Sequence, residues 1–136
     1  MFIRNAYAKN RMTRLALLMT GLLAVSCGAV KMYPGPELTR DKIAVLEIRN
    51  VTVYALDGIP PSLGNKKTLQ ILPGEHVMRM SHNIGGYGEQ PVDYTFIAEP
   101  GHAYILDADY EIQKTLSWRP WVRDTATGLI VGSWKP

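Results

Sequence analysis

The sequence predicts an all-β protein, a small antiparallel β-sandwich of seven or eight short strands that follows an N-terminal signal segment. The chain has 136 residues, a length that suits a single domain. From residue 42 onward, short apolar runs separated by turn residues recur at a spacing of roughly 8–12 residues, which is typical of sandwiches and barrels. The same region contains no long helical periodicity.

The expected strands are rich in β-branched and aromatic residues and end at turn signals. Asp57-Gly58 is a strong hairpin signal, and Pro60-Pro61 ends the strand because proline cannot donate to a ladder. In Pro73-Gly74 and Pro100-Gly101 the glycine is free to take positive φ, so we expect tight turns. The expected strands are 43–48, 51–56, 68–72, 76–80, 92–97 and 102–106, followed by a hairpin of 121–123 and 129–131.

Basic charge is concentrated at the N-terminus. Four of the 15 Lys and Arg residues precede Cys27 and none of the 12 acidic residues does, so the remainder carries 11 basic and 12 acidic side chains. The sequence pI near 9.1 therefore reflects the segment before Cys27, and we expect no nucleic-acid partner. The pair Lys66-Lys67 follows Gly64-Asn65, which predicts a solvated turn rather than a phosphate-binding patch.

Residues 1–26 have the layout of a secretory signal peptide. A basic stretch precedes the apolar run 15–25, and small residues stand at the end of that run. The run is shorter than the roughly 20 residues that span a bilayer, which favours a cleaved signal over a permanent transmembrane helix. The sequence leaves both Met1 and Met12 open as the start, because either places basic residues ahead of the same run.

The segment Leu23-Ala24-Val25-Ser26-Cys27 resembles a bacterial lipobox. The resemblance implies cleavage between Ser26 and Cys27, attachment of lipid to the Cys27 thiol, and acylation of the new amine with a fatty acid such as palmitate. Several acyl chains hold a protein stably on a membrane, whereas one does so only marginally. Gly28 stands where an aspartate tends to retain such proteins in the inner membrane, so the resemblance further implies the periplasmic face of the outer membrane. The alternatives are a plain secretory signal with an unrelated cysteine, or a cysteine that is buried in the core.

After the signal, residues 27–41 are expected to form a lipidated tether or an extended segment lying along the domain, and residues 42–136 the β-sandwich. Over residues 42–132 the turn residues are similar to those of PEGA-type surface domains and of small Gram-negative lipoproteins. The resemblance brings no catalytic motif with it. The residues that carry it are Leu56-Asp57-Gly58, Leu72-Pro73-Gly74, His76-Val77, Pro100-Gly101-His102-Ala103-Tyr104, Trp118, Pro120, Asp124 and Gly128.

The sequence contains no recognisable catalytic or cofactor motif, so we expect no enzyme, no cofactor and no metal. Cys27 is the only cysteine and is expected to carry lipid, which leaves no intrachain disulfide and no thiol nucleophile. His76 and His82 would lie about 20 Å apart along a straight strand, too far to share a metal. His76 and His102 each follow a Pro-Gly turn, and we expect both to hydrogen-bond to backbone groups of those turns.

Asp107, Asp109 and Glu111 alternate along the chain and would share one strand face, with about 6–7 Å between neighbours. A calcium ion could use such oxygens, but the glycine and glutamate of an EF-type loop are absent. The preferred interpretation is a solvated face or an edge strand guarded by charge. The glycine-rich stretch 85–88 precedes a strand rather than a helix, and it is interpreted as a flexible connection.

The aromatic residues are the better candidates for contact with a partner. Trp118 and Trp134 are the candidate contact residues, whereas Trp121 and Tyr104 are expected in the core. The resulting hypothesis is a non-enzymatic binding or envelope accessory module, held on the membrane by lipid, whose partner is an envelope protein or peptidoglycan. One alternative is a small envelope hydrolase or metal-dependent enzyme, which needs a cleft that joins a histidine to a carboxylate. The other is a carbohydrate- or peptidoglycan-binding module, which needs an open face of exposed tryptophans.

Overall fold

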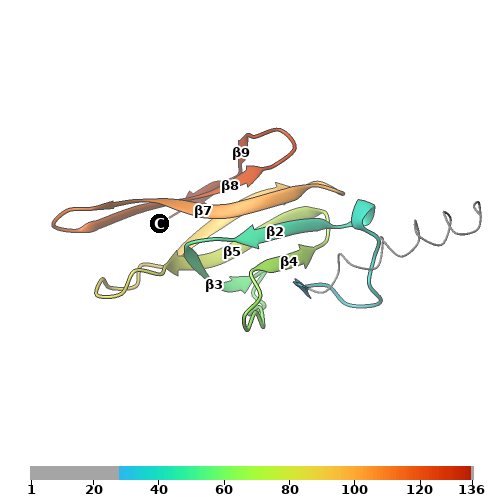
Figure 1. Ribbon diagram of the computed structural model, residues 1–136, viewed down its shortest axis with the longest axis horizontal. Helices are drawn as coiled ribbons and strands as arrows, with labels where there is room; N and C mark the ends of the chain where they lie inside the picture. The colour runs from blue at the N-terminus through green and yellow to red at the C-terminus, as the bar shows by residue number, and fades with distance from the viewer. Residues whose placement is uncertain (1–27, 136) are drawn as a thin grey trace, which may run out of the picture.

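Two β-sheets make up the part of the chain that the computed structural model describes, residues 28–135 (Figure 1). The larger sheet has six strands in the order β1-β4-β2-β7-β8-β9, and the smaller has four in the order β10-β6-β5-β3. The expected all-β class and small sandwich are confirmed. Among residues 28–135 no helix is long and apolar enough to cross a membrane. The elements are β1 (Ala29–Lys31), the 3-10 turn η1 (Arg40–Lys42), β2 (Ala44–Ile48), β3 (Val51–Leu56), β4 (Thr68–Ile71), β5 (Gly74–His82), β6 (Val92–Ala98), β7 (Ala103–Ile112), β8 (Leu116–Asp124), β9 (Ile130–Val131) and β10 (Ser133–Lys135).

Most neighbouring strands are antiparallel, but two pairs are parallel. β2 runs parallel to β7, with Val45 opposite Ala103, and β1 runs parallel to β4, with Ala29 opposite Thr68. β1 belongs to the stretch 27–41, so part of that stretch lies along the domain. Residues 28–135 contain ten strands rather than seven or eight. The strands that the sequence did not predict are β1 and β10, whose three residues each are too few for an alternating pattern to reveal.

The turns form where the sequence places proline and glycine. Asp57 and Gly58 have φ values of 51° and 79°, as a two-residue hairpin turn requires. The residues on either side, Leu56 and Ile59, exchange two backbone hydrogen bonds of 2.9 Å. Gly74 has a φ of 123°, so the Pro73-Gly74 turn also uses the conformational freedom that glycine supplies.

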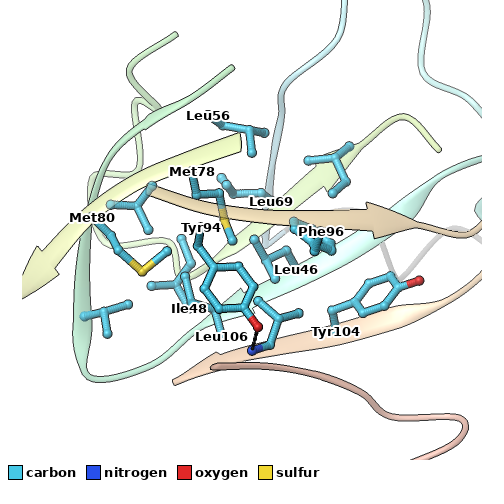
Figure 2. Packing of buried hydrophobic residues seen from close by; sticks show 14 of the residues in the cluster. Leu46, Ile48, Leu56, Leu69, Met78, Met80, Tyr94, Phe96, Tyr104 and Leu106 are labelled. Carbon is cyan, nitrogen blue, oxygen red and sulfur yellow. Dashed lines mark hydrogen bonds between the residues drawn. The ribbon is translucent and has the colours of Figure 1, made fainter. Parts of the chain in front are cut away.

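The hydrophobic core lies between the two sheets and takes alternate residues from each strand (Figure 2). Burying one such large apolar side chain contributes about 1.5–3 kcal/mol relative to leaving it exposed. This burial explains why alternating patterns in the sequence predict the strands. Core residues that are 1% exposed or less include Leu46 and Leu106 of the larger sheet, and Met78, Tyr94 and Phe96 of the smaller sheet.

The chain crosses from the larger sheet to the smaller between β9 and β10. Gly132 occupies the crossing with a φ of 78°, and a Cβ atom built on it would lie 2.2 Å from the carbonyl oxygen of Thr95. The hydroxyl of the buried Tyr94 accepts a hydrogen bond from Val122 N (3.2 Å) and donates one to the Val131 carbonyl (2.5 Å), so it joins β8 to β9. The crossing therefore depends on the absence of a side chain at Gly132 and on the phenolic oxygen of Tyr94.

Candidate functional site: a histidine–carboxylate cluster and a tryptophan-lined groove

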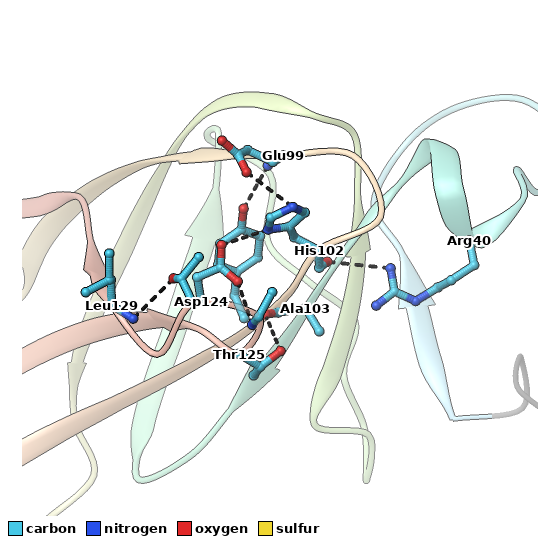
Figure 3. A network of polar contacts seen from close by, with 10 residues as sticks. Arg40, Glu99, His102, Ala103, Asp124, Thr125 and Leu129 are labelled. Carbon is cyan, nitrogen blue, oxygen red and sulfur yellow. Dashed lines mark hydrogen bonds and ion pairs between the residues drawn. The ribbon is translucent and has the colours of Figure 1, made fainter.

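A histidine and two carboxylates meet at the end of the sandwich where β2 and β7 begin (Figure 3). Glu99 and His102 are the first and last residues of the Pro100-Gly101 turn, and His102 N donates to the Glu99 carbonyl over 3.3 Å. Asp124 is the last residue of β8 and lies opposite Tyr104 of β7. The antiparallel pairing of β7 with β8 therefore carries Asp124 to this turn.

The ring of His102 bridges the two carboxylates. Its Nδ1 lies 2.7 Å from Asp124 Oδ2, and its Nε2 lies 3.2 Å from Glu99 Oε2. Asp124 is 4% exposed, whereas Glu99 is exposed, so the cluster runs from the interior to the surface. The His102 ring also stacks on Tyr104 with 6.2 Å between ring centroids, and the Tyr104 hydroxyl accepts a hydrogen bond from Glu99 N (2.8 Å).

Hydrogen bonds stabilise the charged form of Asp124. Burial acts to raise the pKa of this carboxyl, but the hydrogen bonds from His102 and from the backbone N–H groups of Ala126 and Thr127 outweigh burial. The pKa of Asp124 therefore lies below its usual value of 3.8. The Ala126 N–H donates to Asp124 Oδ1 over 2.9 Å, which also shapes the turn between β8 and β9. Asp124 is thus an ionised acceptor at neutral pH.

The cluster joins segments that are distant in the chain (Figure 3). The guanidinium of Arg40, in η1, donates to the carbonyl oxygen of His102 over 3.5 Å. Gly101 N donates to the Ile43 carbonyl over 2.8 Å, which places the β6–β7 turn beside the start of β2. Asp124 begins the β8–β9 turn. Three connections of the sandwich therefore meet around His102.

This arrangement suits a structural clasp better than a metal site or a catalytic site. One donor atom from each of Glu99, His102 and Asp124 lies within 4.8 Å of the others. The two ring nitrogens of His102 face different carboxylates, however. A single metal ion binds only one nitrogen of an imidazole ring, so it would not use both contacts. A general base needs a nitrogen directed at its substrate, and neither nitrogen is directed away from the cluster. The His102 ring has one nitrogen within hydrogen-bonding distance of each carboxylate, and this contact ties the three connections together.

Two open grooves share the side chain of Trp134 in β10. Trp118 of β8 and Trp134 line the first groove, which has a volume of about 400 Å³. Trp121 and Trp134 line the second, which has a volume of about 350 Å³. Trp118 and Trp134 are half-buried because each packs against the core. Charged residues of both signs also line the second groove, namely Asp109, Arg119 and Arg123.

The edge of β8 beside these grooves is only partly covered. β9 pairs with Val122 and Arg123, and within residues 28–135 no other strand pairs with this side of β8. The Tyr94 hydroxyl accepts the hydrogen bond from Val122 N. By strand alternation Pro120 faces the same way as Val122, and it has no N–H to offer. The stretch 116–121 is thus an open edge that a proline protects against unselective strand pairing.

Several residues singled out in the sequence lie apart from both features. Ser26 and Cys27, the expected cleavage and lipidation site, lie outside the described residues, so their roles stay predictions. Lys66-Lys67 is exposed in the loop before β4, as expected of a solvated turn. The stretch 85–88 connects β5 to β6 without helix or strand. Tyr104 is 2% exposed, so its expected place in the core is confirmed.

The expected burial of Trp121 in the core is wrong. Its neighbour Val122 is fully buried, and because side chains alternate along a strand, Trp121 lies on the outer face of the larger sheet, where it is half-buried. There its indole N–H donates to Asp109 Oδ1 over 3.2 Å. The Arg123 guanidinium lies 4.7 Å from the centroid of its ring. These polar partners explain how an indole is accommodated outside the core.

The expectation for the histidines is confirmed for His76 and wrong for His102. His76 Nε2 lies 2.6 Å from the carbonyl of Leu72, in the adjoining turn, and its Nδ1 lies 2.6 Å from Asp57 Oδ2. The His102 ring binds carboxylates instead of turn backbone, because strand pairing brings Asp124 to it from 22 residues away.

The acidic residues of β7 alternate as expected and lie opposite residues of β8. Asp107 pairs across the ladder with Trp121, and its Oδ1 accepts a hydrogen bond from Asn50 Nδ2 (3.1 Å). Asp109 accepts one from Trp121, as described above. Among residues 28–135, the one group of His, Cys, Asp and Glu side chains close enough to hold a metal ion together is the His102 cluster. Hydrogen bonding on a strand face therefore describes Asp107 and Asp109 better than calcium binding does.

No family model, curated protein or solved structure is significantly similar to this chain. The likeness to lipoproteins and PEGA-type domains stays a prediction from residue patterns.

Sequence reasoning missed the contact between His102 and Asp124. Half of the cluster has a local signal, because a Pro-Gly turn places the residues at its two ends, here Glu99 and His102, side by side. The other half depends on the register between β7 and β8, which short patterns do not specify.

Proposed function

We propose that this protein is a non-enzymatic binding or accessory module of the cell envelope, held by lipid on Cys27 at the periplasmic face of the outer membrane. The observation that carries the binding part is the pair of grooves that share Trp134. The anchoring part rests on the residues that end at Cys27 and on their resemblance to a lipobox.

The composition of the two grooves supports contact with a polypeptide. Tryptophan and arginine are enriched among residues that dominate binding energy at protein interfaces, and three tryptophans with two arginines gather here. Trp118 and Trp134 are held in place by the core, so binding would cost little of their side-chain entropy. The open edge of β8 offers backbone groups to an extended segment of a partner. An envelope protein is therefore the preferred partner.

A peptidoglycan-binding module is the alternative that the tryptophans also favour. Sugar rings stack on broad, exposed aromatic faces, but Trp118 and Trp134 each pack partly against the core. Binding of the purified protein to isolated peptidoglycan, in a sedimentation assay, distinguishes the two. Sedimentation that Trp134→Ala abolishes in a still folded protein would favour the peptidoglycan alternative.

A small metal-dependent hydrolase is favoured by one observation, the meeting of His102 with two carboxylates. The orientation of both ring nitrogens toward carboxylates supports a clasp instead. We expect added zinc or calcium to leave the melting temperature of the purified protein unchanged. A metal-dependent rise that is lost in His102→Gln would support the enzyme and contradict the proposal.

The anchor is tested by Cys27→Ser. The variant should lose its lipid and move from the membrane fraction to the soluble periplasmic fraction, because the acyl chains on Cys27 supply the proposed stable attachment. Radiolabelled palmitate and fractionation measure the two effects. A Cys27→Ser protein that stays on the membrane and still incorporates palmitate would rule the anchor out.

The contact surface is tested by photo-crosslinking in intact cells. A photoreactive residue at Ser117, which lines the groove beside Trp118, should capture a defined neighbour that mass spectrometry identifies. The matched control places the same residue at Thr52, an exposed position on β3 of the other sheet. Capture of the same neighbours from both positions, or of none from Ser117, would contradict the assignment of the grooves.

A further inference from the structure

A basic groove lies at the end of the sandwich opposite the His102 cluster, where β2 ends and β4 begins. Its volume is about 500 Å³, and among its lining residues Arg49, Lys66 and Lys67 are basic and Glu47 is acidic. We propose that this groove faces the membrane and binds the anionic headgroups of phospholipids, so that it orients the sandwich on the surface. The inference rests on the lipid anchor of the proposed function and adds a second membrane contact to it.

The position of the groove relative to the anchor follows from the register of β1. Ala29 pairs with Thr68, and Lys67 immediately precedes Thr68. Because β1 and β4 run parallel, the chain before Ala29 leaves the sheet beside Lys67. Ile48 N donates to the Lys67 carbonyl over 2.7 Å, which fixes this loop against the end of β2. The described chain therefore starts at the same end of the domain as the basic groove, two residues after Cys27 in sequence.

The charges of the two lysines are available to a ligand. Lys66 and Lys67 are exposed, and within residues 28–135 neither forms an ion pair. Arg49, in contrast, binds both carboxylate oxygens of Glu47 over 2.9 and 3.3 Å, and this hydrogen bonding raises the pKa of Arg49. With three basic residues and one acidic residue, the lining carries a net charge of +2, which corresponds to the two lysines.

An extended anionic surface suits these lysines better than a single anion does. Both side chains are exposed and flexible, and a lysine binds phosphate as a point charge rather than through a fixed fork of donors. The potential of an anionic membrane falls off within a Debye length of roughly 10 Å, and the register above places the lysines beside the anchored segment. Each lysine near such a surface strengthens the contact by about fivefold, so the pair should shift the orientation equilibrium by about 30-fold.

The test uses the full lipidated protein reconstituted in vesicles. Asn65→Cys introduces a thiol for a donor fluorophore next to the two lysines, and the lipid on Cys27 leaves the new thiol as the one site for labelling. Energy transfer to an acceptor on lipid headgroups reports how close this loop lies to the membrane. Transfer should be higher in vesicles that contain phosphatidylglycerol than in vesicles of phosphatidylcholine alone, and high salt should remove the difference.

Two double variants assign the effect to the groove. Lys66→Gln with Lys67→Gln should lower the transfer on phosphatidylglycerol vesicles to the level seen on phosphatidylcholine. Lys42→Gln with Lys135→Gln removes the same charge from exposed positions that do not line the groove, and it should leave the transfer unchanged. All four lysines are exposed, so the folded state should tolerate both pairs of changes.

The outcomes separate this inference from the anchor itself. The first case is a protein whose mass shows lipid on Cys27. In that protein, equal energy transfer on the two kinds of vesicle, or equal losses of transfer in the two double variants, would overturn the membrane contact. A mass that shows an unmodified Cys27 would overturn the proposed anchor and this inference together. Loss of transfer on addition of inorganic phosphate, but not of chloride at equal ionic strength, would identify a free-phosphate site instead.

Discussion

Replacing Gly132 with alanine should destabilise the sandwich strongly, because it adds a methyl group where the chain passes from one sheet to the other. The new Cβ would lie 2.2 Å from the Thr95 carbonyl oxygen and 2.7 Å from Phe96 Cβ. Both obstacles belong to β6, which is held between β5 and β10 in the smaller sheet. β6 cannot move away from the methyl group without disturbing one of these pairings.

Two penalties add at this position. A φ of 78° costs an alanine about 1–2 kcal/mol relative to glycine. Forcing an extra carbon into a packed region costs about 1–3 kcal/mol. The sum of about 2–5 kcal/mol is a large part of the roughly 5–15 kcal/mol that stabilises a domain. At about 4–8 °C per kcal/mol for a domain of this size, the melting temperature should fall by about 10 °C or more.

Thermal unfolding followed by far-ultraviolet circular dichroism measures the effect. The matched control is Gly128→Ala, because Gly128 has a similar φ of 73° but no atom within 4 Å of the position of its Cβ. Gly128→Ala should show the conformational penalty alone and melt well above Gly132→Ala. Equal melting temperatures would refute the steric argument, and an unshifted Gly132→Ala would refute both parts of it.

Three further predictions concern other positions. Gly74 has a φ of 123°, a backbone conformation that disfavours a β-branched side chain. Gly74→Val should therefore lower the melting temperature by several degrees without changing the proposed membrane attachment. A thermal melt and membrane fractionation measure the two outcomes. Tyr94→Phe should cost about 1–3 kcal/mol in denaturant unfolding, because it leaves Val122 N and the Val131 carbonyl without their shared partner. Folding lowers the pKa of Asp124 below the value of the unfolded carboxyl, 3.8. The contribution of Asp124 to stability is therefore fully present above pH 3.8, and it is lost as the pH falls through the lower pKa of the folded state. Asp124→Asn should therefore reduce the fall in melting temperature below this pH, and an identical acid dependence would contradict the role of Asp124.

Strands β2 to β9 were predictable because their signals are local. In β3 the buried Val51 and Val53 alternate with the exposed Thr52 and Tyr54, and this alternation is legible in the sequence. The partner of each strand was not predictable in the same way. The parallel pairing that places Val45 of β2 beside Ala103 of β7 depends on the path of the whole chain between them.

The candidate site was predictable only in part. The residue type alone singles out Trp118 and Trp134, because tryptophan is common at interfaces. Their half-buried state follows from tertiary packing, such as the stacking of Trp118 on Tyr110 (6.5 Å between centroids) and its edge contact with His82 (5.9 Å). The His102 cluster needed the register of two strands, so no local pattern could assemble it.

If Cys27 carries lipid as proposed, the pairing of β1 with β4 limits how far the sandwich can move from the membrane. A free segment of 27–41 would extend to about 50 Å at about 3.3–3.6 Å per residue. Ala29 is held in the larger sheet, and Cys27 precedes it by two residues, a chain length of at most about 7 Å. A lipidated sandwich would thus stay against the headgroups, and a partner in the peptidoglycan layer would have to reach toward the membrane to meet it.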